Sequence, residues 1–230
     1  MSDVHTYSSD VAFTPAVKEI QTRKGSRDAY AHVEQRGGWR TEIDENLAAF
    51  LAETNSLYFS TASADGQPYI QHRGGPKGFV KILDKTTLAF ADYSGNRQYI
   101  TTGNLAENNR AFLFLMNYAA GERIKIWGHA RVVTGDPQLL AQLVDPHYDG
   151  RVEQAIVFNV TAWDANCSQH IPKFIRAEPA ERAIEVLRRR VRYLETTLRD
   201  AKVAFVLEDE PDFPSERRNG EDRDSPAPSE

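Results

Sequence analysis

The chain has 230 residues, of which 40% are hydrophobic and 27% charged, and its formal net charge is -5 at pH 7. This length allows one sizeable domain or two small ones, and the apolar fraction is large enough for a real core. Nine acidic and three basic residues between Glu208 and Glu230 account for the negative charge. The rest of the chain is near neutral, which argues against nucleic acid as a partner.

Cysteine content and apolar runs favour a cytoplasmic location. The only cysteine, Cys167, excludes an intramolecular disulfide framework and fits a reducing compartment. No metal-binding spacing such as H-E-x-x-H occurs. The N-terminus lacks a signal-peptide pattern, and the longest apolar run, residues 111–116, is too short to cross a membrane. We therefore expect a cytoplasmic protein with no metal and no membrane partner.

The patterns divide the chain into four segments. Residues 1–40 form a weakly patterned N-terminal extension with glycine-containing turns near residues 25 and 37. Residues 41–178 carry the strand-like patterns of a barrel domain. Residues 179–206 read as one helix. Residues 207–230 are rich in Pro, Asp, Glu and Ser, which predicts a disordered acidic tail.

The barrel segment begins with a helix, for which Thr41 is the expected N-cap. Short strands are then expected at residues 57–62, 69–73, 79–83, 87–91, 111–116, 123–133 and 155–163. A polar segment of helical character occupies residues 96–108, and Asp136 and Pro137 open a short helix that runs to Val144. Hairpin-like connections favour an α+β fold, a six- to seven-stranded antiparallel β-barrel with peripheral helices.

The C-terminal helix has an apolar seam with heptad spacing. Its members alternate steps of three and four residues: Ile184, Leu187, Val191, Leu194, Leu198, Ala201 and Phe205. This spacing is typical of a coiled coil of about three heptads. It is equally typical of an amphipathic helix that packs on its own domain, and both interpretations stay open.

Arg73 and Lys77 form the first candidate ligand cluster, because they flank Gly74-Gly75-Pro76 and Gly78 follows. Glycines let a ligand approach the backbone and leave amide donors free. Arginine offers a bidentate fork to phosphate, and lysine offers a point charge. The alternative is a solvated turn with two surface cations.

The second cluster is Ser94-Gly95-Asn96-Arg97-Gln98, which follows a strand and opens a helix. A helix N-terminus is a natural phosphate site, and Ser94, Asn96, Arg97 and Gln98 add donors. The alternative is a plain N-cap and turn.

Lys125 and Trp127 form the third cluster, on one face of a strand because side chains alternate there. Trp127 could pack against the ring system of a ligand, and Lys125 could face an anion. The alternative is a half-buried tryptophan beside a lysine whose charged end reaches solvent.

Residues 40–175 resemble the pyridoxamine 5′-phosphate oxidase-related FMN-binding proteins, a branch of the split-barrel flavoprotein superfamily. The motifs that carry this resemblance are Gln71-His72-Arg73-Gly74-Gly75-Pro76-Lys77-Gly78-Phe79, Ala91-Asp92-Tyr93-Ser94-Gly95-Asn96-Arg97, Asn104-Leu105, Ile126-Trp127-Gly128-His129-Ala130 and Asn166-Cys167-Ser168-Gln169-His170-Ile171-Pro172.

The resemblance implies a split barrel that forms a homodimer with FMN at the subunit interface. It places Arg73 and Lys77 along the flavin ring and phosphate, and Ser94 to Gln98 at the phosphate. The chain has Arg97-Gln98 where the oxidase has Arg-Lys, and its C-terminal end lacks the oxidase's substrate-binding Trp and Arg motif. It is therefore expected to be a relative of the oxidase with a different activity.

The expected function is that of an FMN-dependent oxidoreductase acting on an unidentified small molecule. No catalytic acid or base stands out, because the flavin performs the redox chemistry and the protein binds and tunes it. The alternative is a binding or sensing module without turnover, which holds a flavin, haem or deazaflavin and assembles through the C-terminal helix.

Overall fold

The structure is a computed structural model that describes residues 7–166, 169–172, 174–175 and 177–203. The chain divides into two compact units, Met1–Ile175 and Arg176–Glu230. The expected acidic tail, Cys167 and Phe205 lie outside the described residues.

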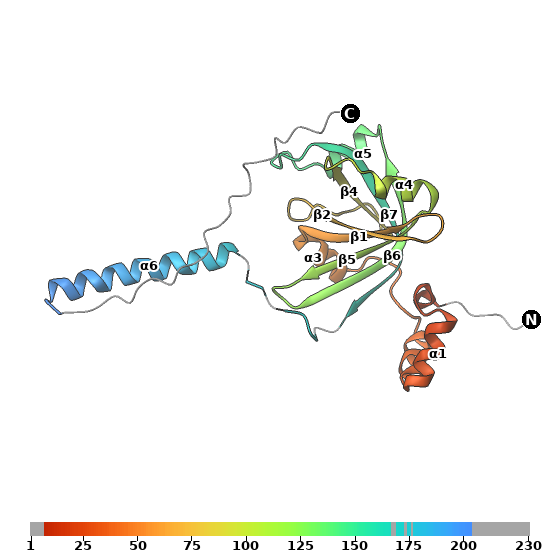
Figure 1. The fold of residues 1–230 in the computed structure, drawn as a ribbon, viewed down its shortest axis with the longest axis horizontal. Helices are drawn as coiled ribbons and strands as arrows, with labels where there is room; N and C mark the ends of the chain where they lie inside the picture. The colour runs from red at the N-terminus through yellow and green to blue at the C-terminus, as the bar shows by residue number, and fades with distance from the viewer. Residues whose placement is uncertain (1–6, 167–168, 173, 176, 204–230) are drawn as a thin grey trace, which may run out of the picture. The chain divides into compact units, whose positions relative to one another are not determined.

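Seven antiparallel strands in the first unit form one sheet in the order β2-β1-β5-β6-β7-β4-β3 (Figure 1). Their bounds are β1 Ser56–Ala62, β2 Pro68–Gly74, β3 Lys81–Ile82, β4 Thr87–Tyr93, β5 Arg110–Asn117, β6 Glu122–Val133 and β7 Val152–Asn166. The strands curl around a large apolar core, and a second, smaller cluster joins β4 and β7 to the helix at residues 137–143. This confirms the predicted antiparallel split barrel with peripheral helices.

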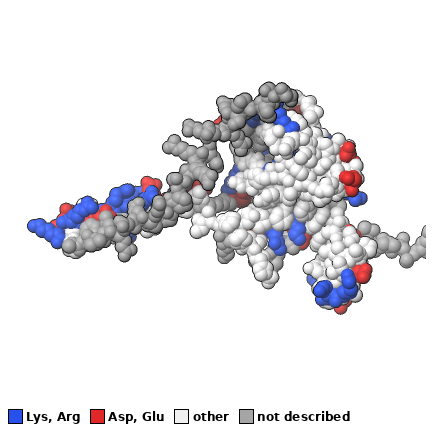
Figure 2. Space-filling model, in the orientation of Figure 1, with Lys and Arg blue, Asp and Glu red and all other residues white. Residues whose placement is uncertain are grey.

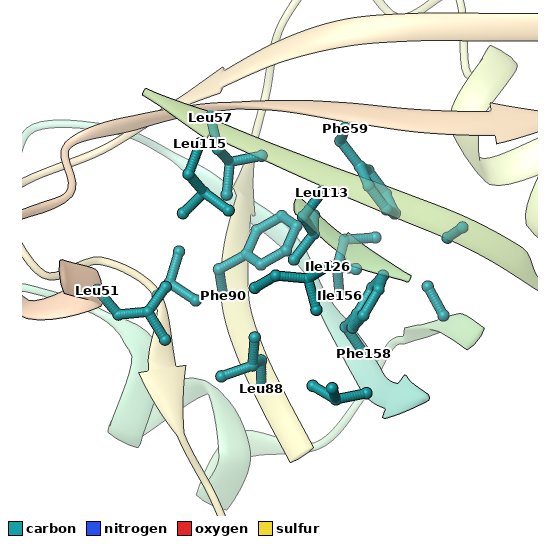
Figure 3. Packing of buried hydrophobic residues seen from close by; sticks show 14 of the residues in the cluster. Leu51, Leu57, Phe59, Leu88, Phe90, Leu113, Leu115, Ile126, Ile156 and Phe158 are labelled. Carbon is teal, nitrogen blue, oxygen red and sulfur yellow. The ribbon is translucent and has the colours of Figure 1, made fainter. Parts of the chain in front are cut away.

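Period-two alternation decides which side chains enter the core. In β6, Ile124 and Ile126 are buried, whereas Lys125 and Trp127 between and beyond them point to the outer face. Figure 3 shows leucine, isoleucine and phenylalanine side chains from several strands meeting inside the barrel. Phe59 of β1 and Phe90 of β4, which are not neighbours in the sheet, have ring centroids 5.8 Å apart. The core therefore holds the two ends of the curled sheet together.

The strand expected at residues 79–83 is only two residues long. Phe79 and Val80 are buried instead of following the alternation. A turn precedes them, in which the amide of Phe79 donates to the carbonyl of Pro76 at 2.9 Å. The prediction of a five-residue strand at residues 79–83 was therefore wrong, and only Lys81–Ile82 form a strand.

Three helices flank the strands: α3 Glu45–Glu53, α4 Ile100–Glu107 and α5 Pro137–Leu143. The N-cap of α3 is Asp44 rather than Thr41, since the Asp44 carboxylate accepts a hydrogen bond from the amide of Leu47 at 2.9 Å. Helix α5 begins as predicted, with Pro137 in its first turn and the Asp136 side chain as its cap.

The N-terminal extension folds into helices that its weak pattern did not predict: η1 Ser8–Val11, α1 Pro15–Lys24 and α2 Arg27–Gln35. Lys18 Nζ lies 2.6 Å from Asp10 Oδ1 and 3.2 Å from Glu34 Oε1, and Arg27 also pairs with Glu34. Glu34 is buried, so these ion pairs are screened little by solvent. Contacts between the helices, which no local pattern reveals, hold this region together. Both expected turns are present.

The second unit contains α6, Ala177–Asp200. None of the described side chains in α6 is buried. Among the residues that the structure describes, no helix has both the length and the apolar character needed to span a bilayer.

Candidate functional site

A polar cleft lies where the curled sheet is split, between β2, β4, β7 and α4. Its lining comprises Tyr69, Gln71, Arg73, Asp92, Tyr93, Gly95, Asn96, Arg97, Gln98, Tyr99, Ile100, Thr101, Thr102, Glu153 and Gln154. Strands β2 and β4 are not neighbours in the sheet, so side chains rather than backbone hydrogen bonds connect them here. The cleft encloses about 40 Å³ in one chain.

Arg73 is directed into the cleft by its register in the sheet. It lies opposite Leu57 across the β1–β2 ladder, and Gln71 lies opposite Phe59. Leu57 and Phe59 are buried, and cross-strand partners project to the same face. Arg73 and Gln71 therefore project to the inner face of the sheet, where the split leaves room for them.

A hydrogen-bond network fixes the Arg73 guanidinium. Its Nη1 lies 2.5 Å from Asp92 Oδ1, and the Arg73 and Asp92 side chains are 16% and 7% exposed. Gln154 Nε2 donates to the other Asp92 oxygen at 2.9 Å and to Thr102 Oγ1 at 3.0 Å. Arg73 Nε is buried and has no hydrogen-bond partner among the described residues. The network thus holds a cation rigidly at the cleft lining, which suits an anionic group.

The segment from Gly95 to Tyr99 forms the opposite wall. The Asn96 side chain accepts a hydrogen bond from the amide of Gln98 at 3.3 Å. Arg97 and Tyr99 have φ angles of 57° and 52°, a region that costs free energy for residues other than glycine. Helix α4 begins directly after this segment, and its N-cap, Tyr99, provides no side-chain cap. The predicted cluster at the start of a helix is therefore present.

Tyr99 and Thr101 attach this wall to neighbouring strands. Tyr99 Oη donates to Glu153 Oε1 at 3.0 Å, and this hydrogen bond raises the pKa of Tyr99. Thr101 Oγ1 donates to Gln71 Oε1 at 3.1 Å. Polar contacts therefore connect this wall of the cleft to both β2 and β7.

The glycine-rich turn after β2 is built for packing, which corrects the expectation of free amide donors. The amide of Gly75 donates to Asn55 O at 3.0 Å, and that of Gly78 donates to Thr54 O at 2.8 Å. A Cβ on Gly75 would lie 2.7 Å from Phe79 Cγ, and Gly78 has a φ of 71°. Steric and conformational demands therefore explain these two glycines without a ligand.

Lys77, at the same turn, does not line the cleft. Its Nζ lies 2.6 Å from Glu53 Oε2, and the Lys77 side chain is 54% exposed. Gly74 and Ser94 are likewise absent from the lining, and the Ser94 amide donates to Arg151 O at 2.8 Å. The structure thus brings Arg73, Asn96, Arg97 and Gln98 together and leaves Lys77 outside.

Lys125 and Trp127 lie on the outer face of the sheet, away from the cleft lining. The Trp127 ring stacks on Trp39 with centroids 4.5 Å apart and also contacts Phe112 at 5.0 Å. Lys125 Nζ lies 5.9 Å from the Trp127 centroid. The shared face is as predicted, but one side of the Trp127 ring is already covered by Trp39.

Burial changes the titration of the charged groups next to this aromatic stack. Lys125 is opposite Asp164 in the β6–β7 ladder. Partial burial lowers the pKa of Lys125, and burial raises the pKa of Asp164. Both shifts disfavour the charged forms, so the pair does not stabilise the isolated chain as a close ion pair would.

Reasoning from the sequence missed Gln154, Thr101 and Thr102 as cleft residues, and it gave no role to Asp92. One signal was available. Asp92 follows four apolar residues of β4 that are all buried, and a carboxylate continuing such a run needs a partner. Gln154 carried no comparable signal. Among the described residues, no cluster of His, Cys, Asp or Glu could hold a metal ion.

The family model described as pyridoxamine 5′-phosphate oxidase matches residues 43–195, which include the cleft and both faces of the sheet. No curated protein matches the chain.

Solved structures match part of the chain at low sequence identity. HupZ of Group A Streptococcus is 15% identical, with 58% of this chain and 99% of that chain covered and a TM-score of 0.45. An FMN-binding protein from Syntrophomonas wolfei is 11% identical, with coverages of 67% and 99% and a TM-score of 0.44. General stress protein 26 from Bacillus anthracis is 17% identical, with coverages of 57% and 96% and a TM-score of 0.40.

Proposed function

Because the chain belongs to the pyridoxamine 5′-phosphate oxidase family, we propose that it is an FMN-binding flavoprotein that acts as an oxidoreductase on a small molecule. Bound FMN supplies hydride or electron transfer, and the protein contributes binding, orientation and electrostatics. The cleft residues would contribute to the binding of the cofactor.

The Arg73 guanidinium, which lines the cleft and is held in place by Asp92, is the observation that supports this proposal. Together with Arg97, Asn96 and Gln98 it offers a concentration of donors to an anion. A volume of about 40 Å³ suits a phosphate group, whereas whole ligands occupy pockets of about 300–1,000 Å³. We therefore assign the cleft to the FMN phosphate.

A homodimer would supply the remaining surface for the flavin. Lys125 and Arg73 project from opposite faces of the sheet, so one chain does not place them in a shared pocket. A flavin at a subunit interface could meet Arg73 of one chain and Lys125 of the partner subunit. In this arrangement Trp127 supports Lys125, since Trp39 covers one side of its ring.

A comparison of FMN with riboflavin tests the phosphate assignment. The full chain is titrated with each compound, and flavin fluorescence is followed. FMN is expected to bind about 10- to 100-fold more tightly, the worth of charge-assisted hydrogen bonds to a phosphate. Equal affinities would mean that the cleft does not bind the FMN phosphate. If neither compound binds, the proposed function is overturned.

Turnover separates the oxidoreductase from the binding module. The flavin-loaded protein is mixed with NADH or NADPH, and absorbance is followed with oxygen as the acceptor. Reduction followed by repeated turnover is expected. A flavin that stays oxidised with these donors, or that is reduced only once, would favour the module without turnover. The absorption spectrum of the protein as isolated distinguishes flavin from haem or deazaflavin.

A further inference from the structure

Within its own unit, helix α6 carries a continuous apolar seam that no other described residue of that unit covers. Ile184, Leu187, Val191 and Leu194 are 46%, 61%, 51% and 50% exposed. They follow the three- and four-residue steps that bring side chains onto one face of a helix. Exposed apolar patches of this kind mark interaction surfaces.

The apolar seam bears on the stability of α6, although its many Ala, Leu, Arg and Glu residues favour a helix by themselves. The ion pair between Arg189 and Glu185 within α6 spans 3.9 Å at the exposed surface. Such pairs contribute a few tenths of a kcal/mol at most. Most helical stability in proteins comes from packing of an apolar face, so this seam needs a partner.

The residue types in the seam select the partner. Ile184 and Val191 occupy the a positions of the heptad, and Leu187 and Leu194 occupy the d positions. β-Branched residues at a with leucine at d favour two parallel strands. We propose that α6 binds α6 of a second copy of this chain and forms a parallel two-stranded coiled coil.

Charges beside the seam agree with the parallel arrangement. Figure 2 shows basic side chains in blue, which are arginines in α6, and acidic side chains in red along this helix. In a parallel pair, Arg190 at g lies next to Glu195 at e of the other copy, and the two charges attract. An antiparallel pair with the same layers would centre on Arg189 and bring Arg188 and Arg190 close to the arginines of the other copy. The antiparallel form is therefore disfavoured by repulsion.

The same charges argue against a membrane or nucleic acid as the occupant. Glu181, Glu185 and Glu195 interleave with the arginines, so the polar face is of mixed sign. Anionic surfaces are bound by faces that are rich in cations alone. A second copy of the helix, whose own charges are complementary, fits this surface better.

Cysteine cross-linking in the full chain tests the proposal. Cys167 is first replaced by Ser, and Leu187→Cys is compared with Arg189→Cys, which is on the outer side of the helix. In a parallel coil, the two Leu187 positions face each other in one d layer. We expect Leu187→Cys to form an interchain disulfide at least about tenfold faster than Arg189→Cys, as held neighbours do.

Three results would overturn the proposal. Equal rates for the two variants would mean random collision. No cross-link for Leu187→Cys would mean that the seam is not in contact with its copy. A cross-link that requires Leu187→Cys on one chain and Val191→Cys on the other would mean an antiparallel pair. The readout needs no flavin, so its failure is distinct from failure of the proposed function.

Discussion

In the β2-β1-β5-β6 part of the sheet, candidate ligand-binding side chains on the inner face and on the outer face have different surroundings. On the inner face, Arg73 is held by Asp92 and retains a donor without a partner. On the outer face, the half-buried Trp127 stacks on Trp39 and contacts Phe112. In the first arrangement a cation is fixed by an ion pair, and we propose that it meets a ligand; in the second, aromatic rings from separate segments pack on one another.

This difference shows that sequence spacing alone does not group residues into a site. All three cation clusters were expected around one flavin because they lie within a short stretch of the chain. Cross-strand register separates them, since Arg73 is opposite the buried Leu57 whereas Lys125 is opposite Phe114. A shared flavin then requires a second subunit.

The largest expected effect comes from removing the aromatic stack on the outer face. We expect Trp127→Ala to lower the unfolding free energy by about 2–4 kcal/mol, somewhat less than for a fully buried tryptophan. The reason is loss of packing against Trp39 and Phe112. Urea unfolding of the full chain measures it.

Trp39→Ala is the matched control, because it removes the other half of the stack. The two changes together should cost less than their sum, by about 0.5–1.5 kcal/mol for a stacked pair. If Trp127→Ala instead leaves stability unchanged and abolishes FMN binding, the tryptophan is a flavin contact and the comparison between the two faces fails.

Arg73 should carry the next largest effect, on affinity rather than on stability. We expect Arg73→Met with Asp92→Asn, which removes both charges of this buried pair, to weaken FMN binding by about 10- to 100-fold. Riboflavin, which has no phosphate, should bind almost as before. Fluorescence titration with both compounds measures the change.

Lys77→Met is the control cation for this experiment. Lys77 pairs with Glu53 at the surface and is not part of the cleft lining, so its removal should leave FMN affinity within about twofold. A loss of affinity for Lys77→Met as large as for the Arg73 variant would mean that the turn after β2 contacts the phosphate.

Gln154 should have a smaller effect on the same measurement. It joins Asp92 to Thr102 of α4 and so positions Arg73 indirectly. We expect Gln154→Leu to weaken FMN binding by about 2- to 10-fold, the worth of one or two hydrogen bonds. Gln138→Leu at the exposed start of α5 is the control. An effect of Gln154→Leu on riboflavin equal to that on FMN would contradict a role through the phosphate.

Local patterns predicted the elements of the barrel because each depends on neighbouring residues. Alternation in β6 and the cap formed by Asp136 are examples, and both confirm the expected structure. Helix α1 also carries local start and stop signals that the sequence prediction left out, with Thr14 as its N-cap and Gly25 in the left-handed conformation at its end. The packing of α1 on α2 through Lys18 and Glu34 has no such local signal.

The candidate site was predictable to a similar extent. Arg73 and Arg97 stood out as cations beside glycine, and the structure places both in the cleft. Gln154 did not stand out, since a glutamine in a strand is usually exposed. Its burial follows from the pairing of β4 with β7, which only the three-dimensional register reveals.

The smallest expected effect concerns Asp164 on the outer face, and its sign follows from burial. Burial raises the pKa of Asp164, although Lys125 and Arg40 act against the shift. The folded chain therefore holds this proton to higher pH than the unfolded chain, whose value is 3.8. Above that pH, ionisation of Asp164 reduces stability progressively until the raised pKa has been passed.

Asp164→Asn should remove this contribution. We expect the difference in unfolding free energy, variant minus wild type, to become more positive as pH rises from about 4 to about 7. Urea unfolding of both proteins across that range measures it. If the unfolding free energies of the variant and the wild type changed with pH in the same way, Asp164 would ionise as freely in the folded chain as in the unfolded chain. The outer face would then tolerate charge as well as the cleft does, and only the aromatic stack would distinguish the two faces.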